Sequence, residues 1–120
     1  MRIGELARRT GLATSAIRFY EQRDMFSPGQ VERRANGYRD YGPSAVRRLE
    51  LIQAGRAAGF SLDEMRNRMR DWDTMPVSQR ADLLREQLEV IEERMQELAR
   101  GRETVLAAIA GLSESDRSSG

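Results

Sequence analysis

The fold is decided by residues 3–24, which read IGELARRTGLATSAIRFYEQRD. Apolar side chains at helical spacing predict a short helix over residues 3–10, and the glycine that follows is typical of a residue that ends a helix. A second helical pattern begins at Thr14 or Ser15, either of which could cap it, and runs to Asp24. Two helices joined by a turn of three or four residues that contains glycine have the spacing of a helix-turn-helix motif. In that motif the second helix enters the major groove of DNA.

A hairpin is expected directly after these helices. Pro28-Gly29 stops regular structure, and Asn36-Gly37 is a strong hairpin signal because both residues accept positive φ angles. The flanks carry three arginines and two tyrosines, and we expect these side chains to lie at the surface because so small a hairpin buries little: Arg33, Arg34, Tyr38, Arg39 and Tyr41. Such a tip favours contact with phosphate; the alternative is a surface turn with incidental charges.

Two further helices complete the N-terminal region. A helix is expected to begin at Pro43 or Ser44 and to run to about Ala58. Either Pro43 lies in its first turn, or Ser44 caps it. After a glycine, Ser61 begins the next helix, over residues 62–70, and the glutamate three positions later has capping-box spacing.

A long C-terminal helix is expected from Ser78 to residue 112. Apolar residues recur along it at alternating steps of four and three, interrupted once at Arg102: Leu84, Leu88, Ile91, Met95, Leu98, Val105, Ile109 and Leu112. At about 1.5 Å per residue, a helix of roughly 50 Å cannot bury this stripe on so small a domain. We therefore expect it to pair with the same helix of a second copy; the alternative is a helix folded back on its own domain.

Charge is divided unevenly along the chain. The net charge of the 120 residues is +1. However, residues 1–70 hold 14 arginines and 8 acidic residues, whereas residues 71–120 hold 6 arginines and 11 acidic residues. Every basic side chain is arginine, whose planar fork of donors suits phosphates and guanine edges. This asymmetry suits a chain that binds a polyanion through its first region only; the alternative is a solvated surface with incidental bias.

Composition excludes several kinds of site. The sequence contains no cysteine and no histidine, which excludes disulfides, iron–sulfur clusters and the usual metal ligands. We expect no metal, no cofactor and no catalytic residue, since a glycine-rich phosphate loop is absent as well. No apolar run approaches the roughly 20 residues of a membrane span, and the first residues show no signal-peptide core. We therefore expect a cytoplasmic protein that is not an enzyme and has no membrane partner.

Four stretches, taken together, resemble the MerR family of bacterial transcription regulators. They are Ile3-Gly4-Glu5-Leu6-Ala7, Ala16-Ile17-Arg18-Phe19-Tyr20-Glu21, Asn36-Gly37-Tyr38-Arg39-Asp40-Tyr41 and Gly59-Phe60-Ser61-Leu62. Each stretch alone is weak evidence, but the set is highly specific in this order and spacing. The C-terminal region matches the family only as a long heptad helix.

The expected fold class is all-α with a small β-hairpin wing. It comprises a winged helix-turn-helix DNA-binding domain over residues 1–70, a hinge over 71–77, a coiled-coil dimerisation helix over 78–112 and a frayed tail over 113–120. The antiparallel arrangement of the coiled coil is what the resemblance implies.

The resemblance also implies which residues contact DNA. On the second helix, Arg18 would read bases or clamp phosphate and Tyr20 would contact phosphate, with Thr14, Ser15 and Phe19 beside them. On the wing, the residues that grip the backbone are Arg33, Arg34, Asn36, Gly37, Tyr38, Arg39 and Tyr41. Arg56 and Ser61 fall where a second winged segment touches phosphate. Two departures stand out: Ala13 replaces a frequent Ser or Thr cap, and Phe19 replaces a frequent tyrosine.

Members of the family generally act as dimers on a near-palindromic operator, inside a promoter whose spacer is too long for RNA polymerase to reach both recognition elements. Bending and untwisting that spacer costs on the order of several kcal/mol, which backbone contacts offset. The hinge is the bistable element that an effector would bias. Three options stay open: a small organic ligand near Trp72 and Met75, a partner protein, or no effector. The competing function is a coiled-coil protein-interaction module without a DNA-binding role.

Overall fold

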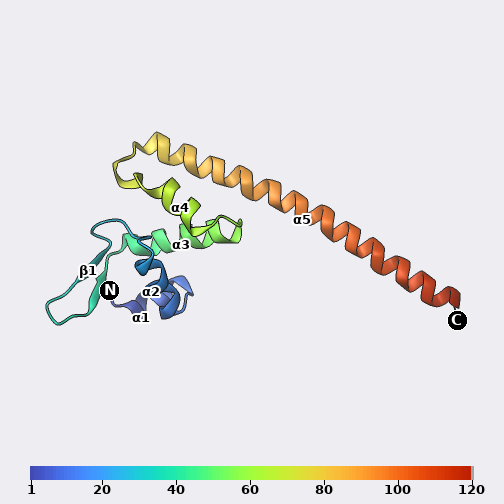
Figure 1. Cartoon of the computed structure of the whole chain (residues 1–120), viewed down its shortest axis with the longest axis horizontal. Helices are drawn as coiled ribbons and strands as arrows, with labels where there is room; N and C mark the ends of the chain where they lie inside the picture. The colour runs from blue at the N-terminus through green and yellow to red at the C-terminus, as the bar shows by residue number, and fades with distance from the viewer. Residues whose placement is uncertain (120) are drawn as a thin grey trace. The chain divides into compact units, whose positions relative to one another are not determined.

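The computed structural model describes residues 1–119 and is predominantly helical (Figure 1). Its elements are α1 (Ile3–Thr10), α2 (Thr14–Gln22), β1 (Val31–Arg33), β2 (Arg39–Tyr41), α3 (Ser44–Ala57), α4 (Leu62–Met69), the 3₁₀ helix η1 (Trp72–Thr74) and α5 (Val77–Ser119). They form two compact units, Met1–Arg80 and the chain from Ala81 onward. The expected all-α class with a small hairpin is confirmed.

The helix-turn-helix consists of α1 and α2. Gly11 ends α1 in the left-handed region at φ 73°, and its N–H donates to the Ala7 carbonyl. Ala13 is the residue before α2, with extended backbone, and Thr14 is already helical. The prediction that Thr14 or Ser15 caps α2 is therefore wrong, because the cap position precedes the first helical residue and alanine has no side-chain acceptor to fill it.

The hairpin pairs β1 and β2 antiparallel, with Val31 opposite Tyr41. The Gly37 N–H donates to the Arg34 carbonyl at 2.9 Å, and Gly37 has a φ of 88°. Asp24 is the one non-glycine residue with positive φ among residues 1–119, so Asn36 does not share the left-handed conformation. The hairpin predicted around Asn36-Gly37 is present, and of these two residues only the glycine has a positive φ. The Arg34 N–H donates to the Tyr38 carbonyl, so residues 35–37 form a three-residue hairpin loop. Gly37 is the last residue of this loop and has left-handed backbone geometry.

The next two helices begin differently. Pro43 precedes α3 and Ser44 is its first helical residue, so Ser44 does not act as the cap. At α4 the predicted capping box is confirmed. The Ser61 hydroxyl accepts from the Glu64 N–H at 3.0 Å, and the Glu64 carboxylate accepts from the Ser61 N–H at 3.4 Å. Local sequence alone fixes this helix start.

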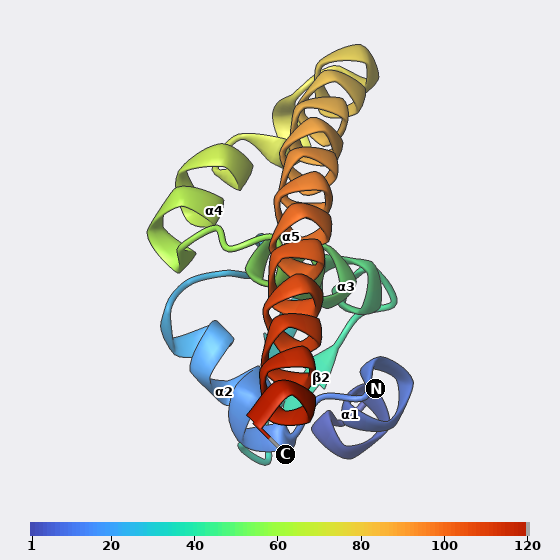
Figure 2. The same cartoon turned by 90° about the vertical axis from the view of Figure 1, so that its right-hand side faces the viewer.

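The core of the first unit gathers apolar side chains from α1, α2, β2, α3, α4 and the segments between them: Leu6, Ile17, Met25, Tyr41, Ala45, Leu49, Ile52, Ala58, Phe60 and Met65. Figure 2 shows α1 and α2 at one end of this unit and α4 at the other, with α3 between them. Tyr41 is 1% exposed, and its ring lies 6.0 Å from that of Phe26. The expectation that the Tyr41 side chain lies at the surface is wrong, because the base of the hairpin packs into the core.

Helix α5 is longer than predicted. It begins at Val77 and continues through Gly101 and Gly111 to Ser119, so the predicted helix end at Leu112 is wrong. The frayed tail over residues 113–120 stays a prediction. A single glycine costs about 1 kcal/mol relative to alanine, which does not break a helix with strong helix formers around it. The last residue of the predicted tail, Gly120, lies outside the described residues.

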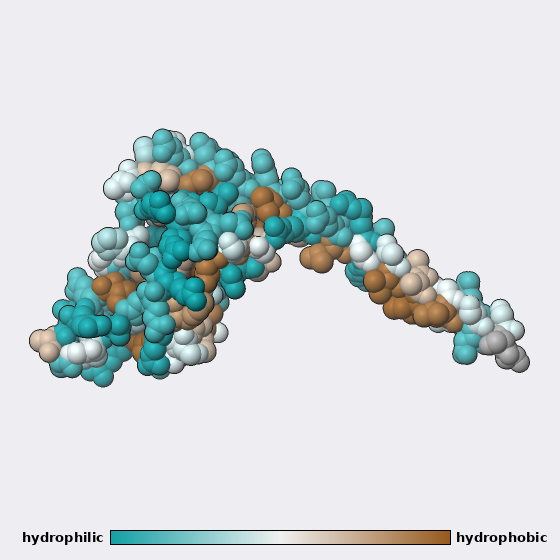
Figure 3. Space-filling model, in the orientation of Figure 1, coloured by the Kyte–Doolittle hydropathy of each residue, from teal (hydrophilic) through white to brown (hydrophobic). Residues whose placement is uncertain are grey.

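The predicted apolar stripe of α5 is largely exposed in the single chain. Apolar side chains gather along one side of the helix in Figure 3, and Leu98 and Leu112 are 74% and 72% exposed. The other exposed members of the predicted stripe are Leu84, Leu88, Met95, Val105 and Ile109, while Ile91 is half-buried. Within residues 1–119, no helix is both long and apolar enough to cross a membrane.

Candidate nucleic-acid interface

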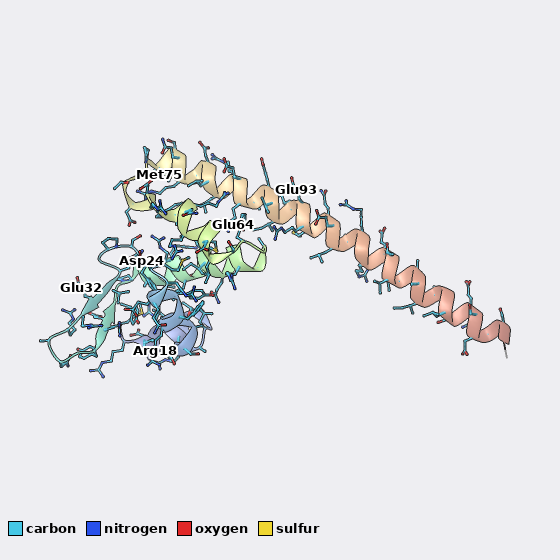
Figure 4. The ribbon with its side chains drawn as sticks, in the orientation of Figure 1. Arg18, Asp24, Glu32, Glu64, Met75 and Glu93 are labelled. Carbon is cyan, nitrogen blue, oxygen red and sulfur yellow. The ribbon has the colours of Figure 1, made fainter. Side chains whose placement is uncertain are left out.

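Helix α2 presents an unpaired cation. Ile17 is fully buried and holds the helix against the core, whereas Arg18, one position later, is exposed (Figure 4). The Arg18 side chain makes no hydrogen bond or ion pair with any residue that the structure describes. Its five N–H donors are thus available to a phosphate or a base edge. Ser15 is also exposed, while Thr14 and Tyr20 are half-buried.

Phe19 and Tyr20 form an aromatic pair next to Arg18. Their ring centroids lie 5.8 Å apart, and the Arg23 guanidinium carbon lies 5.0 Å from the Phe19 centroid. Phe19 is 40% exposed. The surface of α2 thus combines cations with partly exposed rings.

The wing contains both unpaired and paired arginines. The Arg33 side chain is exposed and makes no hydrogen bond or ion pair within residues 1–119. The Arg34 guanidinium instead pairs with Asp40, which also accepts from the Met1 ammonium at 2.7 Å. Hydrogen bonds from Met1 and then from Arg34 lower the pKa of Asp40, and Asp40 raises the pKa of Arg34. Part of the positive charge of the wing is therefore already balanced.

Tyr38 and Asn36 lie at or beside the tip of the wing, and both are exposed. The Arg2 guanidinium carbon lies 4.3 Å from the centroid of the Tyr38 ring, a cation–π contact. Arg2 precedes α1 and was not predicted as a site residue, since only the folded hairpin brings it to the wing.

Glu21 joins α2 to the wing. Its carboxylate accepts from the Arg39 guanidinium and from the Tyr41 hydroxyl, the latter at 3.0 Å. Burial, and then Glu21, raise the pKa of Tyr41 to about 12. Glu21 was not predicted as a functional residue. The available signal was the i, i+2 spacing of Arg39 and Tyr41, which places both on one face of a strand.

The structure brings part of the predicted set together. A hollow of about 220 Å³ is lined by Arg18 of α2 and by Arg2, Gly37, Tyr38, Arg39 and Tyr41. The remaining predicted residues do not line it: Thr14, Ser15, Phe19, Tyr20, Arg33, Arg34, Asn36, Arg56 and Ser61. Arg56 lies near the end of α3, where its side chain is exposed and makes no hydrogen bond or ion pair within residues 1–119.

Comparison with known proteins identifies the family. A family model described as MerR HTH family regulatory protein matches residues 1–72, and another described as MerR, DNA binding matches residues 46–108. The chain is 34% identical over 120 residues to the HTH-type transcriptional regulator HmrR of Rhizobium leguminosarum bv. viciae, covering 98% of this chain and 90% of that protein. The chain belongs to the MerR family. The expected family membership is thereby confirmed.

Other MerR-family proteins are similar over most of the chain. The HTH-type transcriptional regulator CueR of Escherichia coli O6:H1 is 36% identical over 110 residues, covering 89% of this chain and 79% of that protein. HiNmlR, a MerR family regulator solved bound to promoter DNA, superposes with a TM-score of 0.71 at 21% identity, covering 86% of this chain and 78% of that one. A MerR family regulator from Bacillus thuringiensis gives a TM-score of 0.75 at 24% identity, covering 92% and 96%. The two structures show the shared fold.

The segment predicted as a hinge follows α4 in this MerR-family chain. Trp72 and Met75 are half-buried, and Trp72 belongs to the short helix η1. The Arg80 guanidinium donates to the Met75 carbonyl at 3.0 Å, and its carbon lies 5.8 Å from the Trp72 ring centroid. Among residues 1–119, no cluster of three His, Cys, Asp or Glu side chains is placed to hold a metal ion.

Proposed function

We propose that this MerR-family regulator is a homodimer that binds a near-palindromic operator in a promoter spacer, and that it bends and untwists the DNA to control transcription. The observation that carries the proposal is the unpaired, exposed Arg18 on the second helix of the helix-turn-helix, which lines one hollow with the wing. The family relationship supports the DNA-binding role, and one MerR regulator of the same fold was solved bound to promoter DNA.

The contacts follow from which side chains are unpaired. Arg18 on α2 would reach base edges in the major groove, because an arginine fork matches guanine there. Arg33 and Arg56, both exposed and unpaired within the described residues, would contact phosphate and fix the register. Further contacts would come from Thr14, Ser15, Phe19, Tyr20, Arg34, Asn36, Gly37, Tyr38 and Ser61. Tyr41, being buried, is not among the contacts that we propose.

Glu21 is proposed as a positioning residue. Its bonds to Arg39 and Tyr41 tie the helix that would enter the groove to the second strand of the wing. Since one carboxylate links the two elements that we propose to contact DNA, it would hold them at a fixed separation. This linkage acts on specificity through geometry rather than through a DNA contact of its own.

The exposed stripe of α5 supports the dimer. Seven predicted stripe residues are exposed in the single chain, and burial against a second copy would remove that apolar surface from water. We propose an antiparallel pair, following the family resemblance. Its two heads would then occupy two half-sites on one face of the duplex.

The proposal has consequences for partners. RNA polymerase would be affected indirectly, through the shape of the shared promoter, and an unidentified small-molecule effector would act at the hinge near Trp72 and Met75. The relatives are transcriptional regulators, and we propose that this chain likewise acts by binding rather than by catalysis. Binding to promoter DNA would place it in the bacterial cytoplasm.

Binding to duplexes at several salt concentrations tests the proposal. Fluorescence anisotropy should show tight binding to the DNA upstream of the chain's own gene and much weaker binding to scrambled duplexes. Affinity should fall steeply with salt, because arginine–phosphate contacts release counter-ions. Equal and salt-insensitive affinity for all sequences would contradict the proposal. Stable capture of a different protein, with no DNA binding, would favour the protein-interaction module instead.

A further inference from the structure

Arg48 on α3 is a buried cation without a carboxylate partner. Its side chain is 5% exposed, and its guanidinium donates to the hydroxyl of Ser27. Within residues 1–119, no acidic group lies within ion-pair distance of it. Burial lowers the pKa of Arg48, and the more distant Asp73 opposes that shift. Buried charges in proteins are normally paired, so an arginine in this state calls for an anion.

A cavity of about 410 Å³ lies beside Arg48. It is lined by the segment that follows α2, residues 24–28, and by Arg66, Met69 and Arg70 at the end of α4. Three arginines and one acidic residue, Asp24, face this space. Asp24, labelled in Figure 4, is also the one non-glycine residue with positive φ among residues 1–119. Strained backbone of this kind is concentrated at binding sites.

The other two arginines, Arg66 in α4 and Arg70 directly after it, use only some of their donors. Arg66 donates to the Arg23 carbonyl at 3.1 Å and pairs with Asp63. Arg70 donates to the side-chain oxygen of Asn67 at 2.9 Å. Since a guanidinium has five N–H donors, both keep donors for a further acceptor. A second cavity of about 380 Å³ is also lined by Arg48, together with Arg47, Arg80 and Asp73. The Arg48 guanidinium donates to Ser27, which lines the first cavity and not the second, so we assign the anion site to the first cavity.

We propose that the cavity between the segment after α2, α3 and α4 binds a small molecule that carries a phosphate or carboxylate group. Arg48 would be its buried counter-ion, with Arg66 and Arg70 completing the arginine set. Arginine forks bind both kinds of anion through paired hydrogen bonds. Met25, Phe26 and Met69 supply apolar lining for an organic part of the ligand. The site is separate from the wing and does not rest on the proposed DNA-binding function.

Thermal unfolding of the full chain without DNA tests this site. We would compare sodium phosphate, sodium citrate and sodium chloride at equal ionic strength. At ten times the dissociation constant, an anion that binds only the folded state should raise the Tm by about 4 °C or more. The increase should fall to less than about a quarter in Arg48→Gln, whereas Arg8→Gln, which removes an exposed arginine outside the cavity, should respond like the wild type. Equal increases in all three proteins would mean a general salt effect and would overturn the proposal.

The relative response distinguishes the two ligand chemistries. A larger shift in phosphate than in citrate indicates a phosphate site, and the reverse indicates a carboxylate site. Either result supports the proposal. If neither anion gives a saturable increase in Tm, the proposal is contradicted. A site for a DNA phosphate alone would give that negative result, while Arg66→Gln and Arg70→Gln would weaken binding to every duplex.

A second measurement covers the case in which Arg48→Gln does not fold. The double variant Arg66→Gln, Arg70→Gln changes only α4 and its end, and it removes two of the three cations. In a titration of the wild type with inorganic phosphate, the amide NMR signals of Ser27 and Gln30 should shift and saturate, because the Ser27 N–H is held by the Gln30 side chain beside Arg48. The double variant should need at least about tenfold more phosphate. Shifts confined to the wing would overturn the proposal.

Discussion

The unit over Met1–Arg80 and the helix from Ala81 onward differ in how far their apolar side chains are buried within the single chain. The first buries Leu6, Ile17, Leu49 and Ile52 completely within its own fold, whereas the second leaves Leu98 and Leu112 more than two-thirds exposed. The first unit therefore owes its structure to contacts within one chain. The second presents a regular stripe whose stability depends on what covers it. The two units also differ in charge, as the arginine excess lies in the first 70 residues.

The largest effect is expected from a charge placed on the stripe of α5. Leu98→Glu puts a carboxylate into the proposed apolar dimer interface. Because each chain of the dimer would carry this buried charge, self-association should weaken at least about 100-fold. Sedimentation equilibrium measures this directly. Glu97→Gln changes a neighbouring exposed side chain by one charge and should leave the dimer intact. If Leu98→Glu sediments as the wild type does, the stripe is not the interface.

A substitution that leaves a cavity in the core of the first unit should lower the free energy of unfolding, whether or not the chain is dimeric. Leu49→Ala removes a fully buried side chain from α3, and such changes cost about 2–5 kcal/mol. Urea unfolding monitored by circular dichroism, at several protein concentrations, gives the loss. A loss below about 1 kcal/mol would show that Leu49 is not packed as described.

Arginines of the two units should differ in their effect on DNA binding. Arg18→Ala removes the unpaired cation of α2 and should cost about 1–3 kcal/mol on the preferred sequence, with relaxed specificity. Arg100→Ala removes an exposed arginine of α5 and should change the affinity less than about twofold. Anisotropy with matched and mismatched duplexes measures both. Equal losses for the two variants would contradict the assignment of DNA contacts to the first unit.

The smallest expected effect is a pH dependence that originates from Tyr41. Its pKa is raised from 10.0 to about 12 in the folded state, so the folded chain keeps this proton more tightly than the unfolded chain does. The stabilisation is fully present below pH 10 and is lost as pH rises toward 12, by at most about 1.4 kcal/mol per pH unit.

Urea unfolding at pH 9, 10 and 11 checks this dependence. Tyr41→Phe removes the titrating hydroxyl while keeping the buried ring, so its stability should fall less than that of the wild type between pH 10 and 11. A parallel decline in the two proteins would show that Tyr41 is not responsible.

Features that depend on neighbouring residues were predictable from the sequence. The capping box of Ser61 and Glu64 and the helix end at Gly11 were predicted and are present, because each is a bond or a backbone conformation within one turn of chain. The heptad stripe located α5 but not its end, since the cost of Gly111 is small beside the helix propensity around it.

Features that depend on tertiary packing were missed. Tyr41 has the same local sequence signal as the exposed Tyr38, and only the packing of the hairpin base on the core separates them. The bond between Glu21 and Arg39 joins residues from different elements, as does the bond between Arg48 and Ser27. No local pattern predicts such pairs, because their partners are set by the fold.

The central claim is that the two winged helix-turn-helix domains of one dimer bind a promoter. Footprinting on the DNA upstream of the chain's own gene tests it most directly. The protein should protect two half-sites related by a two-fold axis, about one or two helical turns apart, with enhanced cleavage between them where the DNA is distorted. A single protected half-site, or no protection at concentrations where the chain is dimeric, would contradict the account.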